Sequence, residues 1–288
     1  MAFSGTVRVQ LNGTWTTLTY NSSSGAYEAT LTAPGKTSFN EIGGVYVVTA
    51  KATNTAGTSE TKTANLTVKE TVKPVITISS PSNGAYIASN QPNIVFTVTD
   101  ETNGSGVKID SLSVKIDGRA ITSGITKTAI TNGYSVTVTP STLSDGSHTV
   151  TINCSDNDGN RATEKSTTFT VDTVPPVLNV TSPDDGLITN KSTVVVAGTT
   201  NDSTSSPVTL TVNGNTVSVG SDGSFSTTVT LSEGKNTITI KAVDKAGKVS
   251  TVTRTVTLDS STPVIESITI TPNPVNTSES MVIRVVVK

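Results

Sequence analysis

A proline that opens an apolar run, followed by a second proline, recurs along this chain and limits what it can fold into. The motif reads PVITISSP at residues 74–81, PVLNVTSP at residues 176–183 and, more loosely, PVIESITITP at residues 263–272. The copies begin about 100 and about 90 residues apart, which is the size of a small domain. This period predicts tandem domains of one kind.

Two hairpin features recur between these openings. In each repeat an apolar run ends in Asn-Gly or Asp-Gly, at residues 12–13, 117–118 and 213–214. These pairs supply the positive φ angles of a tight hairpin turn. A later hairpin ends in a glycine in every repeat, at Gly57, Gly159 and Gly247. Each full repeat therefore holds about seven short strands, as in an immunoglobulin-like (Ig-like) β-sandwich.

Composition agrees with an all-β chain. Only 33% of the residues are hydrophobic and 4% are aromatic. Thr and Ser make up roughly a third of the chain, and Thr favours strands over helix interiors. The expected fold is all-β, with tandem Ig-like β-sandwiches. Because the linkers are short and contain proline, we expect an extended rod.

The repeats place boundaries near Thr71, Thr173 and Ser261. They divide the chain into Ig-like domains at residues 1–70, 71–172 and 173–260 and a two-strand tail at residues 261–288.

The first repeat lacks its opening strands, since its Asn-Gly turn comes after only 11 residues. The tail from residue 263 resembles those missing strands. We therefore hypothesise head-to-tail self-association, in which residues 263–288 of one chain add strands to the first domain of another. The simpler alternative is a shorter first sandwich with a stub or docking segment at the other end.

Charge excludes several partners. The net charge is −2, without a basic stripe, which argues against nucleic acid. No apolar run is long enough for a transmembrane helix, so no membrane insertion is expected. The first residues do not resemble a secretory signal, which predicts assembly in the cytoplasm unless a signal was removed. The single Cys excludes an internal disulfide framework.

No catalytic residue and no cofactor is predicted. His148 is the one His, it shares a strand face with Val150 and Ile152, and no partner for it is visible in the sequence. It is expected to pack at the rim of a sandwich. Cys154 occupies a position filled by alanine in the other repeats, so a small buried hydrophobe is expected there. There is no nucleophile elbow and no phosphate-binding loop.

A calcium site is one interpretation of the acidic residues. In an Ig-like sandwich the loop after the second strand and the loop before the last strand lie at the same end. Clustered carboxylates there would suit Ca²⁺, which prefers six to eight oxygen ligands. The competing interpretation, which we favour at this stage, has Asp156 and Asp244 capping their own turns and the other acids solvated. The candidate ligands are Asp100, Glu101, Asp156, Asp158, Asp172, Asp202 and Asp244.

Aromatic residues give a weak indication of glycan binding. Trp15, Tyr20 and Tyr27 lie in the first repeat, and Tyr86 lies near the start of the second. An exposed aromatic strip can stack on sugars. Scattered aromatics of this kind are more often core and rim residues, so a bacterial surface glycan remains only an alternative partner.

The proline openings, together with DNDGN at residues 156–160, resemble bacterial Ig-like repeats. Residues 3–6, 18–25, 33–34 and 270–275 resemble Ig-like proteins of clostridial prophages and phage-tail-like particles. This resemblance implies a non-enzymatic part of a phage tail, such as a spacer, decoration, baseplate or fibre component. It also implies other tail or particle proteins as partners and a virion or particle assembled in the cytoplasm.

Two alternatives to a phage-tail component stay open. The chain could be a bacterial cell-surface adhesin or glycan-binding stalk, in which case it would be extracellular. It could also be the accessory region of a secreted glycan hydrolase, which would need a catalytic domain outside these residues.

Overall fold

The structure is a computed structural model, and it describes residues 3–288. In this part of the chain the regular elements are strands, apart from two short 3-10 helices, η1 (Ser38–Asn40) and η2 (Ile42–Gly44). None of the described helices is long and apolar enough to cross a membrane. The chain divides into two compact units, the first ending at Asp172 and the second beginning at Thr173.

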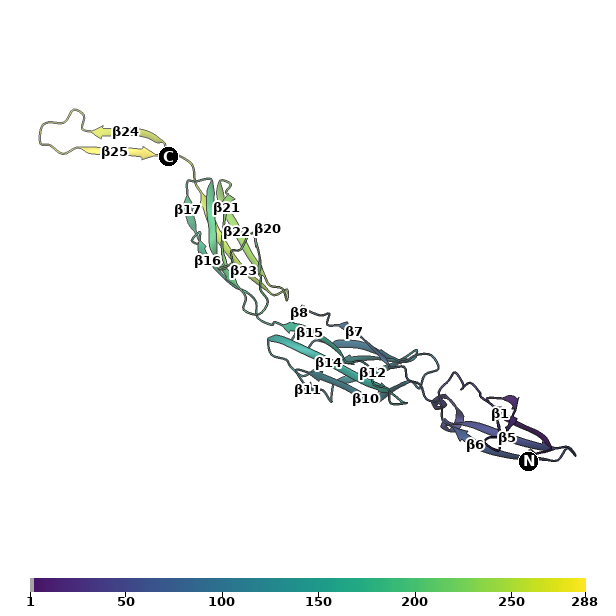
Figure 1. Cartoon of the computed structure of the whole chain (residues 1–288). Helices are drawn as coiled ribbons and strands as arrows, with labels where there is room; N and C mark the ends of the chain where they lie inside the picture. Colours follow the sequence, from purple (N-terminus) through teal and green to yellow (C-terminus); the bar gives the residue numbers. More distant parts are fainter. Residues whose placement is uncertain (1–2) are drawn as a thin grey trace. The chain divides into compact units, whose positions relative to one another are not determined.

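Domain 2, residues 71–172, is a sandwich of two sheets (Figure 1). One sheet has the strand order β12-β13-β9-β7, and the other has the order β11-β10-β14-β15-β8. Strand β8 pairs in parallel with β15, so the chain changes sheets between β7 and β8. The strands are β7 (Val75–Ser80), β8 (Ala85–Ile87), β9 (Ile94–Thr99), β10 (Val107–Ile116), β11 (Arg119–Ala120), β12 (Ile125–Ile130), β13 (Gly133–Val138), β14 (Gly146–Asp156) and β15 (Lys165–Val171).

Alternation along the central strands builds the core of domain 2. In β9, Ile94, Phe96 and Val98 are fully buried, and the residues between them are half-buried. Val150 and Ile152 of β14, in the opposite sheet, are also fully buried. Each sheet therefore turns one apolar face toward the other, and each large side chain removed from water contributes about 1.5–3 kcal/mol.

Domain 3, residues 173–260, repeats this architecture around its own core. Its sheets have the orders β16-β18-β21 and β17-β23-β22-β19-β20, and β17 again pairs in parallel with the last strand, β23. Fully buried Leu210, Ile238 and Ile240 lie at the centre of its apolar cluster. The strands are β16 (Val177–Ser182), β17 (Leu187–Thr189), β18 (Thr193–Asn201), β19 (Thr209–Val212), β20 (Asn215–Val217), β21 (Ser224–Thr230), β22 (Gly234–Val243) and β23 (Val249–Leu258).

The hairpin turns follow the repeated Asn-Gly and Asp-Gly pairs. Asn12, Asp117 and Asn213 have φ angles of 48°, 51° and 48°, and the glycine after each is also positive. Two consecutive positive φ angles define the turn that matches the twist of a two-residue hairpin. The hairpin prediction is confirmed, and with it the all-β fold of tandem Ig-like sandwiches.

Domain 1, residues 3–70, has one four-stranded sheet of order β2-β1-β5-β6 and a small hairpin, β3–β4. Tyr46 is the one buried apolar residue among the described residues of this domain. No strands corresponding to β7, β8 and β9 of domain 2 occur in residues 3–70. The strands are β1 (Gly5–Leu11), β2 (Thr14–Thr17), β3 (Thr19–Asn21), β4 (Ala26–Glu28), β5 (Tyr46–Asn54) and β6 (Ser59–Leu66).

The tail forms a separate antiparallel pair, β24 (Ile265–Thr271) and β25 (Val282–Val287), which Figure 1 shows without a third strand. Every residue of both strands is exposed.

The fold of domain 2 depends on the apolar contact between its two sheets. Replacing fully buried Phe96 with alanine should lower the free energy of unfolding of domain 2 by about 3–5 kcal/mol, because it removes apolar contacts and leaves a cavity. Calorimetry would measure the shift. The matched control, Ile130→Ala at an exposed position of the same domain, should cost about 0.5 kcal/mol or less. Equal effects of the two substitutions would contradict this description of the core.

Candidate metal centre

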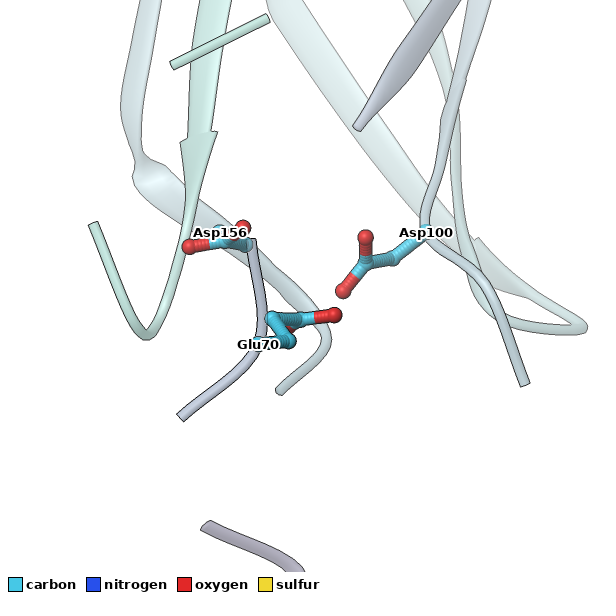
Figure 2. A group of neighbouring side chains, drawn as sticks. All are labelled: Glu70, Asp100 and Asp156. Carbon is cyan, nitrogen blue, oxygen red and sulfur yellow. The ribbon is translucent and has the colours of Figure 1, made fainter. Parts of the chain in front are cut away.

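Three carboxylates from distant parts of the sequence meet at one end of domain 2 (Figure 2). Glu70 lies in the segment before β7, Asp100 directly follows β9, and Asp156 is the last residue of β14. Each offers one oxygen, and these oxygens lie within 4.8 Å of one another. The carboxylate groups of Glu70 and Asp100 point toward each other in Figure 2.

Glu70 is attached to both loops that border the site. Its Oε1 accepts a hydrogen bond from the backbone N–H of Ser105. Its own N–H donates to Oδ2 of Asp158 at 3.1 Å, and its carbonyl accepts from Nδ2 of Asn160 at 3.2 Å. Its Oε2 is buried and has no hydrogen-bond partner among the described residues. The side chain is therefore held in place with one oxygen unused.

Asp100 is the most constrained of the three. The residue is only 7% exposed, and its Oδ2 accepts from the N–H of Gly106 at 2.7 Å. Its Oδ1 is buried without a hydrogen-bond partner in the described chain. Burial raises the pKa of Asp100 to about 6, opposed by the Gly106 hydrogen bond and reinforced by the nearby charges of Glu70, Asp156 and Asp158. The site therefore disfavours its own negative charge.

Asp156 has both of the roles that its sequence allows. Its Oδ1 accepts from the N–H groups of Gly159 at 2.6 Å and Asn160 at 2.8 Å, so it caps its own turn. Its Oδ2 accepts from Nδ2 of Asn160 at 2.8 Å. Asp156 is fully buried, and it also belongs to the carboxylate cluster. Capping and cluster membership, which the sequence presents as alternatives, occur together.

Glu101 and Asp158 border the cluster. Oε2 of Glu101 is buried and lacks a hydrogen-bond partner among the described atoms. A Cβ at Gly104 would lie 2.7 Å from Oε2 of Glu70 and 2.9 Å from Oε1 of Glu101. Glycine at this position therefore leaves room for both carboxylates. Asp158 contacts the linker through Glu70 and does not point a free oxygen into the cluster.

This arrangement has the chemistry of a hard-cation site. Its donors are all oxygens, several carry negative charge, and two to three of them have no other partner. None of the ion pairs between described residues involves these carboxylates. Ca²⁺ accepts six to eight oxygen ligands in a flexible geometry, whereas Mg²⁺ demands a near-ideal octahedron and Zn²⁺ prefers nitrogen and sulfur. Ca²⁺ is the best match.

The other candidate ligands occupy similar positions elsewhere. Asp202 and Asp244 in domain 3 are buried, and each offers an oxygen within 4.8 Å of the other. Oδ1 of Asp202 accepts from the N–H groups of Thr204 and Ser205, and Oδ1 of Asp244 accepts from that of Lys248. Both therefore cap local turns, and Oδ2 of Asp244 is buried without a described partner. Asp172 directly follows β15 at the end of the first unit, where it is fully buried.

Sequence reasoning did not include Glu70, although a pattern could have indicated it. Glu70, Asp172 and Asp259 each lie four residues before an opening proline, so every linker begins with an acid. Aligning the linkers, and not only the domains, would have added Glu70 to the candidate ligands.

His148 has partners that the sequence did not reveal. Its Nδ1 lies 2.7 Å from Oδ2 of Asp117, and its Nε2 lies 2.8 Å from the carbonyl oxygen of Ser144. The expectation of a packed rim His without a partner is therefore wrong in its second part. The partner is a carboxylate on the neighbouring strand β10, placed by the hairpin turn at Asp117. Cys154 is buried, with its pKa raised by burial, which does not favour a reactive thiolate.

The aromatic residues of domain 1 are half-buried and do not form one strip. The rings of Tyr20 and Tyr27 lie 5.3 Å apart on the β3–β4 hairpin. Trp15 instead contacts Arg8, whose guanidinium carbon lies 5.8 Å from the ring centre.

Two families match parts of the chain. Residues 73–173 match the family described as bacterial Ig-like domain, and residues 176–260 match the family described as glucodextranase, domain B. The matched ranges agree with domains 2 and 3 of the structure. The chain is thus an Ig-like repeat protein over most of its length, although neither family covers half of it.

One curated relative shares a short region. Bacillopeptidase F of Bacillus subtilis (strain 168) is 32% identical over 126 residues, which are 44% of this chain and 9% of that protein. The chain therefore corresponds to a small part of that relative.

Solved structures with a similar fold include two multidomain proteins. Fibronectin(III)-like modules of Clostridium thermocellum CbhA are 20% identical, with a TM-score of 0.40, covering 64% of this chain and 94% of theirs. A tetra-tandem repeat from the extending region of a large adhesion protein is 23% identical, with a TM-score of 0.37, covering 100% of this chain and 81% of its own. At these identities the likeness concerns the fold alone.

The environment of His148 predicts a pH dependence. A carboxylate and a carbonyl oxygen can only accept hydrogen bonds, so both ring nitrogens are satisfied only in the protonated imidazole. Burial lowers the pKa of His148, but the hydrogen bonds to Ser144 and Asp117 outweigh it and raise the pKa above its ordinary value. The resulting stabilisation is complete below pH ~6.5 and is lost as the pH rises through the higher pKa of the folded state.

The melting temperature of domain 2 should therefore fall between about pH 6 and about pH 8.5. Because Asp117 is partly exposed, the loss should be about 1 kcal/mol or less. Calorimetry across this range measures it, and His148→Gln should flatten the profile. A wild-type melting temperature that is constant or rises over the same range would contradict this assignment.

Proposed function

We propose that this chain is a non-enzymatic spacer built from Ig-like domains, in which a bound Ca²⁺ fixes the junction between domains 1 and 2. The observation that carries the proposal is the cluster of Glu70, Asp100 and Asp156, in which Oε2 of Glu70 and Oδ1 of Asp100 are buried and unpaired. An unpaired buried carboxylate oxygen costs free energy, and a cation would supply the missing partner.

The position of the cluster suggests what the cation would do. Glu70 belongs to the linker, whereas Asp100 and Asp156 belong to loops of domain 2. Asn40 of η1 in domain 1 donates from Nδ2 to the carbonyl of Gly104 at 2.6 Å, and Gly104 lies in the same loop as Asp100. A cation bound to this loop and to Glu70 would hold the linker against domain 2. It would also keep the loop in position for its contact with domain 1.

Several observations support a role without catalysis. The matched families describe an Ig-like domain and a lettered domain of a larger enzyme. His148 is occupied by Asp117 and Ser144, and Cys154 is buried, so neither is available as a base or nucleophile in the described structure.

We place this spacer in a bacterial surface or secreted protein, as an adhesive stalk or accessory region. Extracellular modules bind Ca²⁺ with dissociation constants of about 0.1–1 mM, which a site with few preset ligands can reach. The local likeness to Bacillopeptidase F supports an accessory role within a larger bacterial protein.

The second candidate function is a structural part of a phage tail or tail-like particle. It rests on the resemblance of residues 3–6, 18–25 and 270–275 to Ig-like proteins of such particles.

Immunogold electron microscopy distinguishes the two locations. Antibodies against the chain should label the surface of intact cells or the secreted fraction if the chain is a stalk or accessory region. Gold confined to tail-like particles released by lysis would instead favour the second candidate.

A calcium titration tests the cation. With Ca²⁺ at about ten times its dissociation constant, binding should add about 1.4 kcal/mol and raise the melting temperature of domain 2 by about 5 °C. Asp100→Asn should raise the melting temperature in chelator, because it removes a disfavoured buried charge, and should abolish the response to Ca²⁺. Calorimetry with and without chelator measures both effects.

Two further variants control this experiment. Asp110→Asn removes an exposed carboxylate from β10 of the same domain and should leave the response unchanged. Gly104→Ala places a methyl group against the carboxylate of Glu70, so it should weaken Ca²⁺ binding with little effect on the melting temperature in chelator. A wild-type protein that does not respond to several millimolar Ca²⁺, or an undiminished response in Asp100→Asn, would overturn the proposal.

A further inference from the structure

The tail hairpin carries an apolar face that nothing in the described structure covers. The pairs Ile268 with Val285 and Ile270 with Ile283 lie side by side across the two strands. Because opposed residues share a face, this side of the hairpin is continuous and apolar. Its six residues are Ile265, Ile268, Ile270, Ile283, Val285 and Val287, which are 39–60% exposed. The opposite face instead carries Ser267, Thr269 and Arg284 among its residues.

Such a hairpin needs a partner. An isolated two-stranded pair is at best marginally stable in water, and a soluble protein rarely leaves a large apolar patch exposed. Ten large apolar residues of the tail are exposed, counting both faces and the residues that flank the strands. Together they present on the order of 800 Å², which is what one partner contributes to an interface of standard size.

Domains 2 and 3 show where a pair of this kind belongs. In domain 2 the first strand β7 pairs antiparallel with β9, with one register shift, and domain 3 pairs β16 with β18 in the same way. The tail pair β24–β25 has the same antiparallel pairing and also one register shift. In domain 2 the apolar face of this pair is buried, as Ile76, Phe96 and Val98 show. The tail is thus an opening strand pair without the rest of its sandwich.

Domain 1 is a sandwich without its opening strand pair. Val7 and Val9 of β1 lie on one face of its sheet, opposite Ala52 and Ala50 of β5. This face is apolar, but Val7 and Val9 are only half-buried and Ala50 is exposed. The corresponding residues of β10 in domain 2, Val114 and Ile116, are 2% and 4% exposed. The difference is the absence of a complete second sheet over domain 1.

The remaining strands fit together in one order. In domain 2 the sheet β12-β13-β9-β7 places the opening pair beside β13. In domain 1, β3 and β4 form a hairpin, and β4 follows Gly25 as the aromatic end of β13 follows Gly133. Adding β25 beside β4 would give the order β3-β4-β25-β24, which is the order found in domain 2.

We propose that β24–β25 of one copy of this chain completes domain 1 of a second copy. The apolar face of the hairpin would cover Val7, Val9 and Val48, and β25 would pair with β4. Each chain then has one donor end and one acceptor end. The contact is head-to-tail, so it propagates along a series of chains unless the series closes into a ring.

A complementation experiment on the full chain tests the proposal. Val285→Asp places a charge on the apolar face of the hairpin and removes the donor. Val9→Asp places a charge on the open face of domain 1 and removes the acceptor. Light scattering should show that wild-type mass grows with concentration from about 1 μM to about 100 μM, a range in which interfaces of this size assemble. Each variant alone should stay monomeric, and an equimolar mixture should form heterodimers and nothing larger.

A matched control and a second measurement separate assembly from misfolding. Thr269→Asp adds the same charge to the opposite face of the hairpin and should assemble like the wild type. Amide hydrogen exchange should show β25 protected in the assembled wild type and unprotected in the Val285→Asp variant, with domains 2 and 3 protected in both. A wild-type chain that stays monomeric over the whole range overturns the proposal, as does a mixture of the two variants that forms no heterodimer.

Discussion

Every sheet of this protein has one apolar face, and only a second sheet can remove that face from water. In domains 2 and 3 the second sheet is present, so Phe96 and Ile238 are fully buried although few residues are aromatic or large. The same constraint explains the two ends of the described chain. Domain 1 has a sheet without enough cover, and the tail has a strand pair with nothing to cover. A sandwich divided in this way leaves both parts with unfavourable surfaces that are complementary to each other.

The candidate cation site follows from the same two-sheet arrangement. Strands β9 and β14 belong to opposite sheets and end at the same end of the sandwich, so an acid after one meets an acid at the end of the other. The linker enters at this end, which brings Glu70 to the same place. Loops at the ends of a sandwich are free to carry polar groups because the strands alone hold the core. The buried acids therefore cost the fold little beyond their own desolvation and mutual repulsion.

The sequence predicted the parts that depend on local pattern. Asn-Gly turns and alternating apolar residues depend on neighbouring positions, so the strands, the domain period and the proximity of Asp100 to Asp156 could be inferred. Glu70 could not be found in this way, because a linker has no periodicity and its position depends on contacts with Ser105 and Asn160. The partner of His148 was missed for a similar reason. Asp117 is 31 residues away, and only the register between β10 and β14 brings the two together.

The two junctions proposed for this chain depend on different forces, and this difference has a physical consequence. A cation at Glu70 and Asp100 binds by charge, so its occupancy depends on calcium concentration and on the protonation of Asp100, whose pKa is raised to about 6. The strand exchange buries apolar surface and forms backbone hydrogen bonds, so it depends mainly on chain concentration and only weakly on salt. Removing calcium would loosen the linker inside each chain and leave the contacts between chains intact. Dilution would separate the chains and leave the cation bound, so an assembly of this kind can change its stiffness without changing its length.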